Sequence, residues 1–120
     1  MKIAVSASAF AMDLPVDQRF GRTPGFIVYD SESQSGVYID NQQNLNAAQG
    51  AGIQTAQNVV RAGAQAVITG HTGPKAFHVL KTASIPVYHA HDITIQEAIN
   101  RLMAGQLSPA ENSDVEGHWV

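Results

Sequence analysis

The chain has 120 residues, of which 44% are hydrophobic and only 14% are charged, and its formal net charge is −3 at pH 7. This length and composition indicate one globular domain and exclude an intrinsically disordered chain. The charge gives no basic surface for nucleic acid, and no apolar run is long enough to span a membrane, so we expect neither as a partner. The absence of cysteine excludes metal sites built on protein thiolates, and it fits the reducing cytoplasm in which we expect the protein.

The first part of the chain predicts three strands, at residues 2–7, 26–30 and 36–40. The first is a short apolar run, which is typical of a buried strand and too short for a signal peptide. The other two are rich in aromatic and β-branched residues and flank a polar stretch, which indicates a hairpin. Residues 8–24 interrupt the pattern with two prolines and a glycine, and they predict a long loop of the kind that often carries function.

The second part of the chain alternates helices with strands. Apolar residues at helical spacing predict three helices, and two apolar runs between them predict two strands. Thr94 followed by Glu97 forms a capping box at the start of the last helix. In chain order the prediction is a helix from near Asn44 or Asn46 to Gly63, a strand at 64–70, a helix at 74–83, a strand at 85–89, and a helix from Thr94 to Gly105.

This order predicts an α/β fold. The alternating half implies parallel strands joined by helical crossovers, and the first three strands read as an antiparallel meander. The expected product is one five-stranded mixed sheet in spatial order 3-2-1-4-5, flanked by helices, which is the ribonuclease-H-like arrangement. We expect this domain to span residues 1–106. Residues 107–120 lose periodicity and carry Glu111, Asp114 and Glu116 without a basic residue, which predicts an acidic flexible tail.

In open α/β sheets, ligands sit beyond the carboxyl ends of the parallel strands. The loops 8–24, 71–74 and 89–94 are therefore expected to meet at one edge of the sheet, which we call the rim. Exposed N–H groups at the start of the helix at 74–83 favour an anion there, and basic side chains add positive charge. Histidines can also ligate soft or borderline metals. The rim is expected to gather Ser6, Ser8, Asp17, Arg19, Arg22, His71, Thr72, Lys75, His89, His91 and Asp92.

Simpler interpretations of the same residues stay open. The stretch GHTGP at 70–74 suits a plain strand-to-helix connector, and it lacks the Lys-Ser/Thr ending of a phosphate loop. The histidines of HAHD at 89–92 could be solvated, and Arg19 and Arg22 could pair with nearby aspartates. A two-metal nuclease needs several convergent carboxylates, and the strand at 2–7 has none.

Six segments of the chain are informative together: KIAVSAS, DQRFGRTPGFIVYD, IDN, GAG, AVITGHTGPKAF and TIQEAINRLMAGQL. In this order they resemble the dinitrogenase iron–molybdenum cofactor biosynthesis family, of the NifX and NifB C-terminal type, and the resemblance extends over nearly all of residues 1–107. The resemblance implies a ribonuclease-H-like fold and non-enzymatic binding of a molybdenum- or iron-containing sulfide cluster at the rim. Its most specific parts, RFGR at 19–22 and GxxGPKA at 70–76, add Phe20, Gly21, Gly73 and Pro74 to the expected contacts. The candidate metal ligands are His71, His89 and His91.

One departure from the family pattern narrows the expected cargo. Members dedicated to nitrogenase carry histidine directly before Phe-Gly, whereas this chain has Arg19, which stays charged and does not ordinarily ligate metal. The Arg-Phe-Gly-Arg form resembles small stand-alone members, among which a molybdenum–copper–sulfide anion is held noncovalently. The resemblance therefore implies a molybdenum–copper–sulfide cluster, or a related molybdenum- or iron–sulfide cluster, and a protein acceptor for it. The alternative is a protein-interaction module of the same fold with no bound metal.

Overall fold

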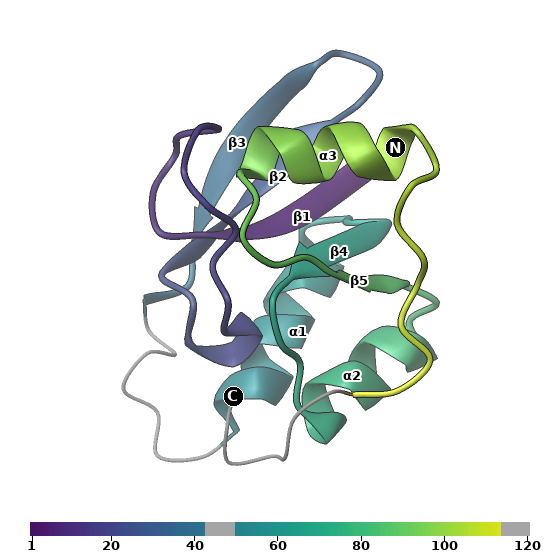
Figure 1. The fold of residues 1–120 in the computed structure, drawn as a ribbon. Helices are drawn as coiled ribbons and strands as arrows, with labels where there is room; N and C mark the ends of the chain where they lie inside the picture. Colours follow the sequence, from purple (N-terminus) through teal and green to yellow (C-terminus); the bar gives the residue numbers. More distant parts are fainter. Residues whose placement is uncertain (43–49, 114–120) are drawn as a thin grey trace.

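A computed structural model describes residues 1–42 and 50–113 and shows one sheet with helices on both sides (Figure 1). All five predicted strands and three predicted helices form, and one additional 3-10 turn, η1, lies in the long first loop. In chain order the elements are β1 (Lys2–Ala7), η1 (Phe20–Arg22), β2 (Gly25–Asp30), β3 (Ser35–Asp40), α1 (Ala51–Arg61), β4 (Ala66–Thr69), α2 (Pro74–Thr82), β5 (Val87–His89) and α3 (Ile95–Met103).

The five strands form a single mixed sheet in the order β3-β2-β1-β4-β5, which confirms the predicted fold. Strand β1 lies in the centre, antiparallel to β2 and parallel to β4, with Ile3 opposite Tyr29 on one side and Ala66 on the other. Strand β5 continues the parallel half, and Thr69 lies opposite His89. The three parallel strands therefore end at the same edge of the sheet.

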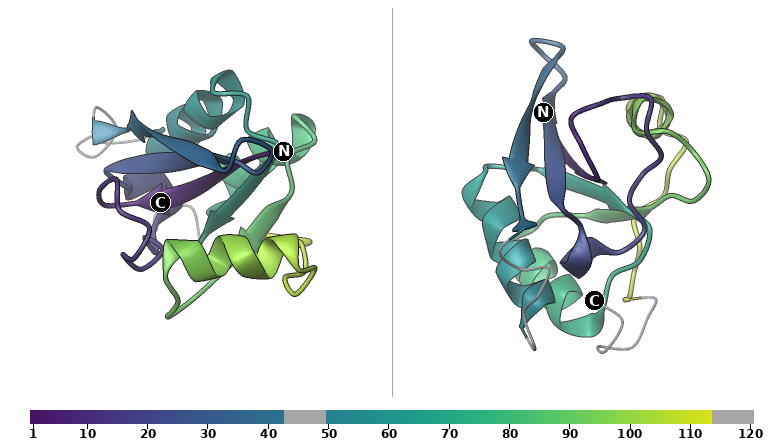
Figure 2. Two further views of the ribbon diagram at one scale, coloured as in Figure 1. Left: turned by 90° about the horizontal axis from the view of Figure 1, so that it is seen from above. Right: turned by 90° about the vertical axis from the view of Figure 1, so that its left-hand side faces the viewer.

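Each face of the sheet has its own hydrophobic core. Successive side chains of a strand point to opposite faces, so Ala4 of β1 packs toward α1 and α2 while Ile3 and Val5 pack toward α3. Figure 2 shows α1 and α2 together on one side and α3 alone on the other. No helix in the described part of the chain is long and apolar enough to cross a membrane.

Helix α1 begins later than the sequence pattern predicted. Gly50 has a left-handed backbone (φ 77°), so the helix does not run back through it, and the first helical residue is Ala51. The predicted caps Asn44 and Asn46 lie outside the described residues. At α3 the predicted cap is confirmed, because Thr94 Oγ1 accepts a hydrogen bond from the Glu97 N–H (3.1 Å).

The residues after α3 run along the sheet edge as far as they are described. Leu107 packs against the core on the α3 face, and the Ala110 N–H donates to the Val87 carbonyl of β5 (2.7 Å). Two of the three acidic residues expected in the tail, Asp114 and Glu116, lie outside the described residues. The division into a domain at 1–106 and a flexible tail at 107–120 therefore stays a prediction.

Candidate functional site

Three loops join at the rim, beyond the ends of β1, β4 and β5. Loop 8–24 pairs with the loop after β4, because Arg19 and His71 form a parallel bridge and the Phe20 N–H donates to the His71 carbonyl (3.2 Å). The loop after β4 is joined to the end of β5 by Thr72 Oγ1 and His89 Nε2, which lie 2.8 Å apart. Arg19, on the first loop, is thus held beside His71 on the second.

A buried polar network fastens loop 8–24 from beneath. Ser6, next to the last residue of β1, is fully buried, and its hydroxyl donates to the Asp17 carbonyl (2.6 Å) and lies 2.8 Å from Thr69 Oγ1. The Asp17 N–H donates in turn to the Ser6 carbonyl (2.9 Å). These bonds leave no buried side-chain polar atom without a partner in the described part of the chain. The network joins the residues just before the RFGR segment to the end of β1 and so fixes the position of that segment.

Phe20 anchors the same segment to the core. Its ring is fully buried and meets the ring of Phe26 edge-on, with centroids 5.4 Å apart. Burying a phenylalanine ring stabilises a fold by roughly 1.5–3 kcal/mol. The RFGR turn is therefore held from inside by Phe20, while Arg19 on the other side of it is exposed.

Gln18 is the hub of the rim, and sequence analysis did not single it out. Its side-chain amide donates to the carbonyls of Val16 (2.9 Å) and Ala90 (3.2 Å), and its Oε1 lies 2.7 Å from His91 Nδ1. The approach to Gly70 is so close that a Cβ there would lie 2.5 Å from Gln18 Cα. That glycine, at the end of a strand and before a loop, was the available signal of a close backbone approach.

Two histidine rings lie together on the surface of the rim. The ring centroids of His71 and His91 are 4.9 Å apart, and the ring planes are tilted by 39°. His91 is exposed and His71 is half-buried, so the pair can be reached from solvent. His89, the third predicted ligand, is half-buried and uses Nε2 toward Thr72. No group of three or more His, Asp or Glu side chains poised for a metal ion occurs among the described residues.

Helix α2 brings its amino-terminal end to the rim. Gly73 is the N-cap and Pro74 the first helical residue, and no side chain in the described ranges caps this turn. The N–H groups of a first helical turn carry partial positive charge and favour an anion. Lys75, in the same turn, is exposed. His78 is exposed further along α2, and His118 lies outside the described residues.

The predicted contacts differ in what they offer a ligand. Ser6, Phe20 and Thr72 are fully buried, and Gly21 and Gly73 are buried as well, so this group shapes the rim from below. The second group is exposed or half-buried, and contact of its members with a ligand stays a prediction. It comprises Ser8, Arg19, Arg22, His71, Pro74, Lys75, His89 and His91.

Asp17 adds an acidic group to the rim. Burial raises the pKa of its carboxyl above the ordinary value of 3.8, and this effect outweighs the hydrogen bond from the Arg19 N–H (3.1 Å) and the charge of Arg19, which both lower the pKa. Arg19 thus interacts with the Asp17 carboxylate in two ways, through a hydrogen bond from its backbone N–H and through the positive charge of its side chain.

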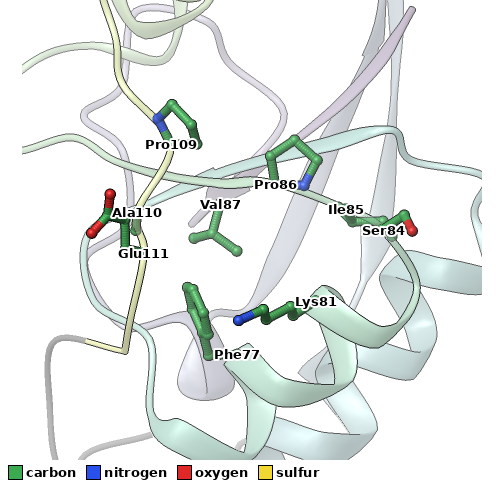
Figure 3. Close-up of a pocket in the computed structure, with 9 residues that line it drawn as sticks. All are labelled: Phe77, Lys81, Ser84, Ile85, Pro86, Val87, Pro109, Ala110 and Glu111. Atoms are coloured by element: carbon green, nitrogen blue, oxygen red, sulfur yellow. The ribbon is translucent and has the colours of Figure 1, made fainter.

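A separate groove of about 400 Å³ lies along α2 and β5. Figure 3 shows the side chains of Phe77 and Lys81 in its lower half, the segment Pro109–Glu111 at the upper left, and Val87 between them. None of its lining residues belongs to the loops that form the rim. The groove is therefore separate from the rim, and the binding expected at the rim does not involve it.

Comparisons with known proteins agree with this architecture. The profile of the family described as dinitrogenase iron-molybdenum cofactor matches residues 1–105. An uncharacterized protein of Methanocaldococcus jannaschii is 31% identical over 106 residues, which cover 82% of this chain and 89% of that protein.

Two solved structures are similar over almost their whole length. The apo form of the orange protein from Desulfovibrio gigas has a TM-score of 0.93 and 37% identity, with 95% of this chain and 96% of that chain covered. A Thermotoga protein related to NifB has a TM-score of 0.82 and 31% identity, with 97% and 98% covered. The fold, the order of the loops at the rim and the match over residues 1–105 lead to one conclusion: the chain belongs to the dinitrogenase iron-molybdenum cofactor family.

Proposed function

We propose that the rim binds and carries a preformed anionic metal–sulfide cluster, of the molybdenum–copper–sulfide type or a related molybdenum- or iron–sulfide type. The protein acts as a carrier and not as an enzyme. Family membership ties the chain to the handling of a metal cofactor, and the resemblance to stand-alone members supports the specific cargo. In this proposal a protein acceptor takes the cluster from the rim.

The observation that carries this proposal is the composition of the rim surface. Arg19 lies beside His71, the His71 and His91 rings form an accessible pair, and the start of α2 presents N–H groups without a side-chain cap in the described chain. All of these are hydrogen-bond donors or metal ligands, and Arg19 stays charged at any physiological pH. Such a set suits the sulfur atoms of an anion that brings its own inorganic sulfide.

A preformed cluster also agrees with the limited number of ligands. A structural ion such as zinc takes four protein ligands in a closed site. Among the described residues of the rim, the His71 and His91 rings lie together, and one ring nitrogen of His91 is already engaged with Gln18. Two imidazoles and several cationic donors are enough to hold a cluster whose metals are already coordinated by sulfide.

Reconstitution tests the proposal. The protein is incubated without oxygen with tetrathiomolybdate and copper, separated from small molecules by gel filtration, and analysed for metals and for visible absorption. We expect molybdenum and copper to elute with the protein at a fixed ratio, together with a charge-transfer spectrum. Molybdate with copper, without sulfide, is the matched control and should leave the protein colourless.

A parallel sample with ferrous iron in place of copper decides between the cargo types. Retention of molybdenum with iron, and not with copper, would move the cargo to the iron–sulfide type. If the protein retains no metal in either sample, the carrier function is wrong, and the same fold acting as a protein-interaction module becomes the better interpretation.

A further inference from the structure

The orientation of the Gln18 side chain is determined by its surroundings. The amide nitrogen lies 2.9 Å from the Val16 carbonyl and 3.2 Å from the Ala90 carbonyl, and carbonyl oxygens can only accept. If the amide were flipped, Oε1 would face the carbonyl oxygens of Val16 and Ala90. All three atoms are acceptors, so no hydrogen bond could form between them. The NH₂ group therefore donates to the two loops, and Oε1 is fixed as an acceptor.

This orientation decides which nitrogen of His91 carries the proton. Nδ1 of His91 lies 2.7 Å from Gln18 Oε1, and because that oxygen only accepts, Nδ1 must donate. In the neutral ring the other nitrogen, Nε2, then has the lone pair. The exposed His91 shows no partner for Nε2 within the described ranges, so this lone pair is available at the surface of the rim.

We propose that Gln18 is a positioning residue that holds His91 in the Nδ1–H form and so presents Nε2, beside His71, as a ligand to a metal of the bound cluster. The inference rests on the proposed function and names the ligating atom within it. Imidazole is a suitable ligand for copper and iron, and a hydrogen bond at the far ring nitrogen orients a ligating histidine and raises its basicity. Gln18 does not touch the cargo itself.

The backbone around Gln18 makes it a firm support. Gly70 lies against the Cα, Cδ and Oε1 atoms of Gln18 at distances that admit no side chain. The amide links the first loop, through Val16, to the third loop, through Ala90. Since His91 directly follows Ala90, the same amide holds both the ring and the backbone from which the ring extends.

Nitrogen NMR of the metal-free protein tests the tautomer independently of any cargo. At about pH 8.5, long-range ¹H–¹⁵N correlations separate protonated from unprotonated ring nitrogens of neutral histidine. We expect a protonated Nδ1 and an unprotonated Nε2 at His91 in the unmodified chain. A protonated Nε2 there overturns the inference without the need for any variant.

Three variants separate positioning from simple packing. Gln18→Glu keeps an acceptor for His91 but loses both donated bonds, whereas Gln18→Leu and Gln18→Met lose all of them. We expect the Glu variant to keep the Nδ1–H form and the Leu and Met variants to lose it. If the tautomer is the same in all three, Gln18 does not set it. Backbone amide spectra identify any variant that fails to fold, and Met replaces Leu in that case.

Cargo retention completes the test. In the reconstitution with tetrathiomolybdate and copper, we expect Gln18→Leu to bind the cluster about 10-fold more weakly and Gln18→Glu to lose less. Equal retention in the unmodified chain and the Leu variant overturns the role of His91 Nε2 as a ligand. If the unmodified chain takes up no cluster at all while its NMR shows the expected tautomer, the proposed function fails and the positioning by Gln18 stands.

Discussion

The rings of His71 and His91 lie 4.9 Å apart although they belong to different loops. His71 follows β4 and His91 follows β5, and these strands are parallel neighbours with Thr69 opposite His89. The sheet topology therefore creates the pair, because the two loops leave the same edge side by side. A two-histidine surface of this kind is a property of the fold and not of a local sequence motif.

Replacing the two histidines tests the pair as a unit. We expect His71→Ala and His91→Ala each to weaken retention of the molybdenum–copper–sulfide cluster about 10-fold or more, since a lost charged hydrogen bond or ligand costs roughly 1.5–3 kcal/mol. Because the rings are in contact, the fold-loss of retention in the double variant should be smaller than the product of the two single fold-losses. The measurement is metal analysis after gel filtration across a dilution series.

His78→Ala is the matched control for these variants. His78 is exposed on α2 and belongs to none of the three rim loops, so its removal should leave retention unchanged. Equal losses from His78→Ala and His71→Ala would show that the histidines act through overall charge and not through the rim.

Arg19 should contribute through charge and donor geometry together. We expect Arg19→Ala to reduce cluster retention about 10-fold and Arg19→Lys to restore part of it, because lysine keeps the charge but not the planar donor pair. Arg61→Ala removes the same charge from an exposed residue at the end of α1 and serves as the control. Raising the salt concentration should weaken cluster retention in the unmodified chain and in Arg61→Ala. The same change should weaken retention less in Arg19→Ala, because the charge that salt screens is already missing there. An Arg19→Ala variant as retentive as Arg61→Ala contradicts this assignment.

Much of the fold could be predicted from the sequence because local patterns and crossover rules are enough to determine it. The apolar runs of β1 and β4, the hairpin signal before β3, and the alternation with helices imply the sheet order that the structure has. The meeting of the loops follows from the same rule, since parallel strands end at one edge.

The finer features of the site could not be predicted, because they depend on contacts between distant residues. Gln18 lies in a loop without periodicity, and its partners Ala90 and His91 come from far along the chain. Ser6 was a candidate contact because it lies near the end of a strand, yet its hydroxyl turns inward to the Asp17 carbonyl. The start of α1 depended on the left-handed backbone of Gly50, which helical spacing does not reveal.

Asp17→Asn should change the pH dependence of stability. Burial raises the Asp17 pKa in the folded protein, so the folded state holds this proton more tightly than the unfolded chain does. The free energy of unfolding therefore falls as the pH rises from the ordinary value of 3.8 through the raised folded pKa. The asparagine side chain does not ionise, so the variant does not lose stability in this way, and its side-chain oxygen can still accept from the Arg19 N–H. The free energy of unfolding of Asp17→Asn, relative to that of the unmodified chain, should therefore rise across that pH window and then level off.

Urea unfolding at a series of pH values measures the difference between Asp17→Asn and the unmodified chain. Asp13→Asn removes the same charge from an exposed position and controls for net charge. The expectation fails if the two variants give the same pH profile. In the reconstitution, Asp17→Asn should also retain the anionic cluster more tightly, because it removes a negative charge next to Arg19.

Gly70→Ala should disturb the rim through Gln18. A Cβ at this position would lie 2.5 Å from Gln18 Cα and 2.5 Å from its Oε1, so backbone atoms must move and not only a side-chain end. Overpacking of this kind typically costs 1–3 kcal/mol, and we expect a loss of about that size in urea unfolding. Gly36→Ala is the control, since the nearest of the atoms that its Cβ would meet, the Ile27 Cγ2 methyl, lies 3.3 Å away. Displacement of Gln18 should also alter the NMR signals of the His91 ring in Gly70→Ala, whereas Gly36→Ala should leave these signals unchanged. Unaltered His91 signals in Gly70→Ala would mean that the loop accommodates the added methyl group without moving the Gln18 amide.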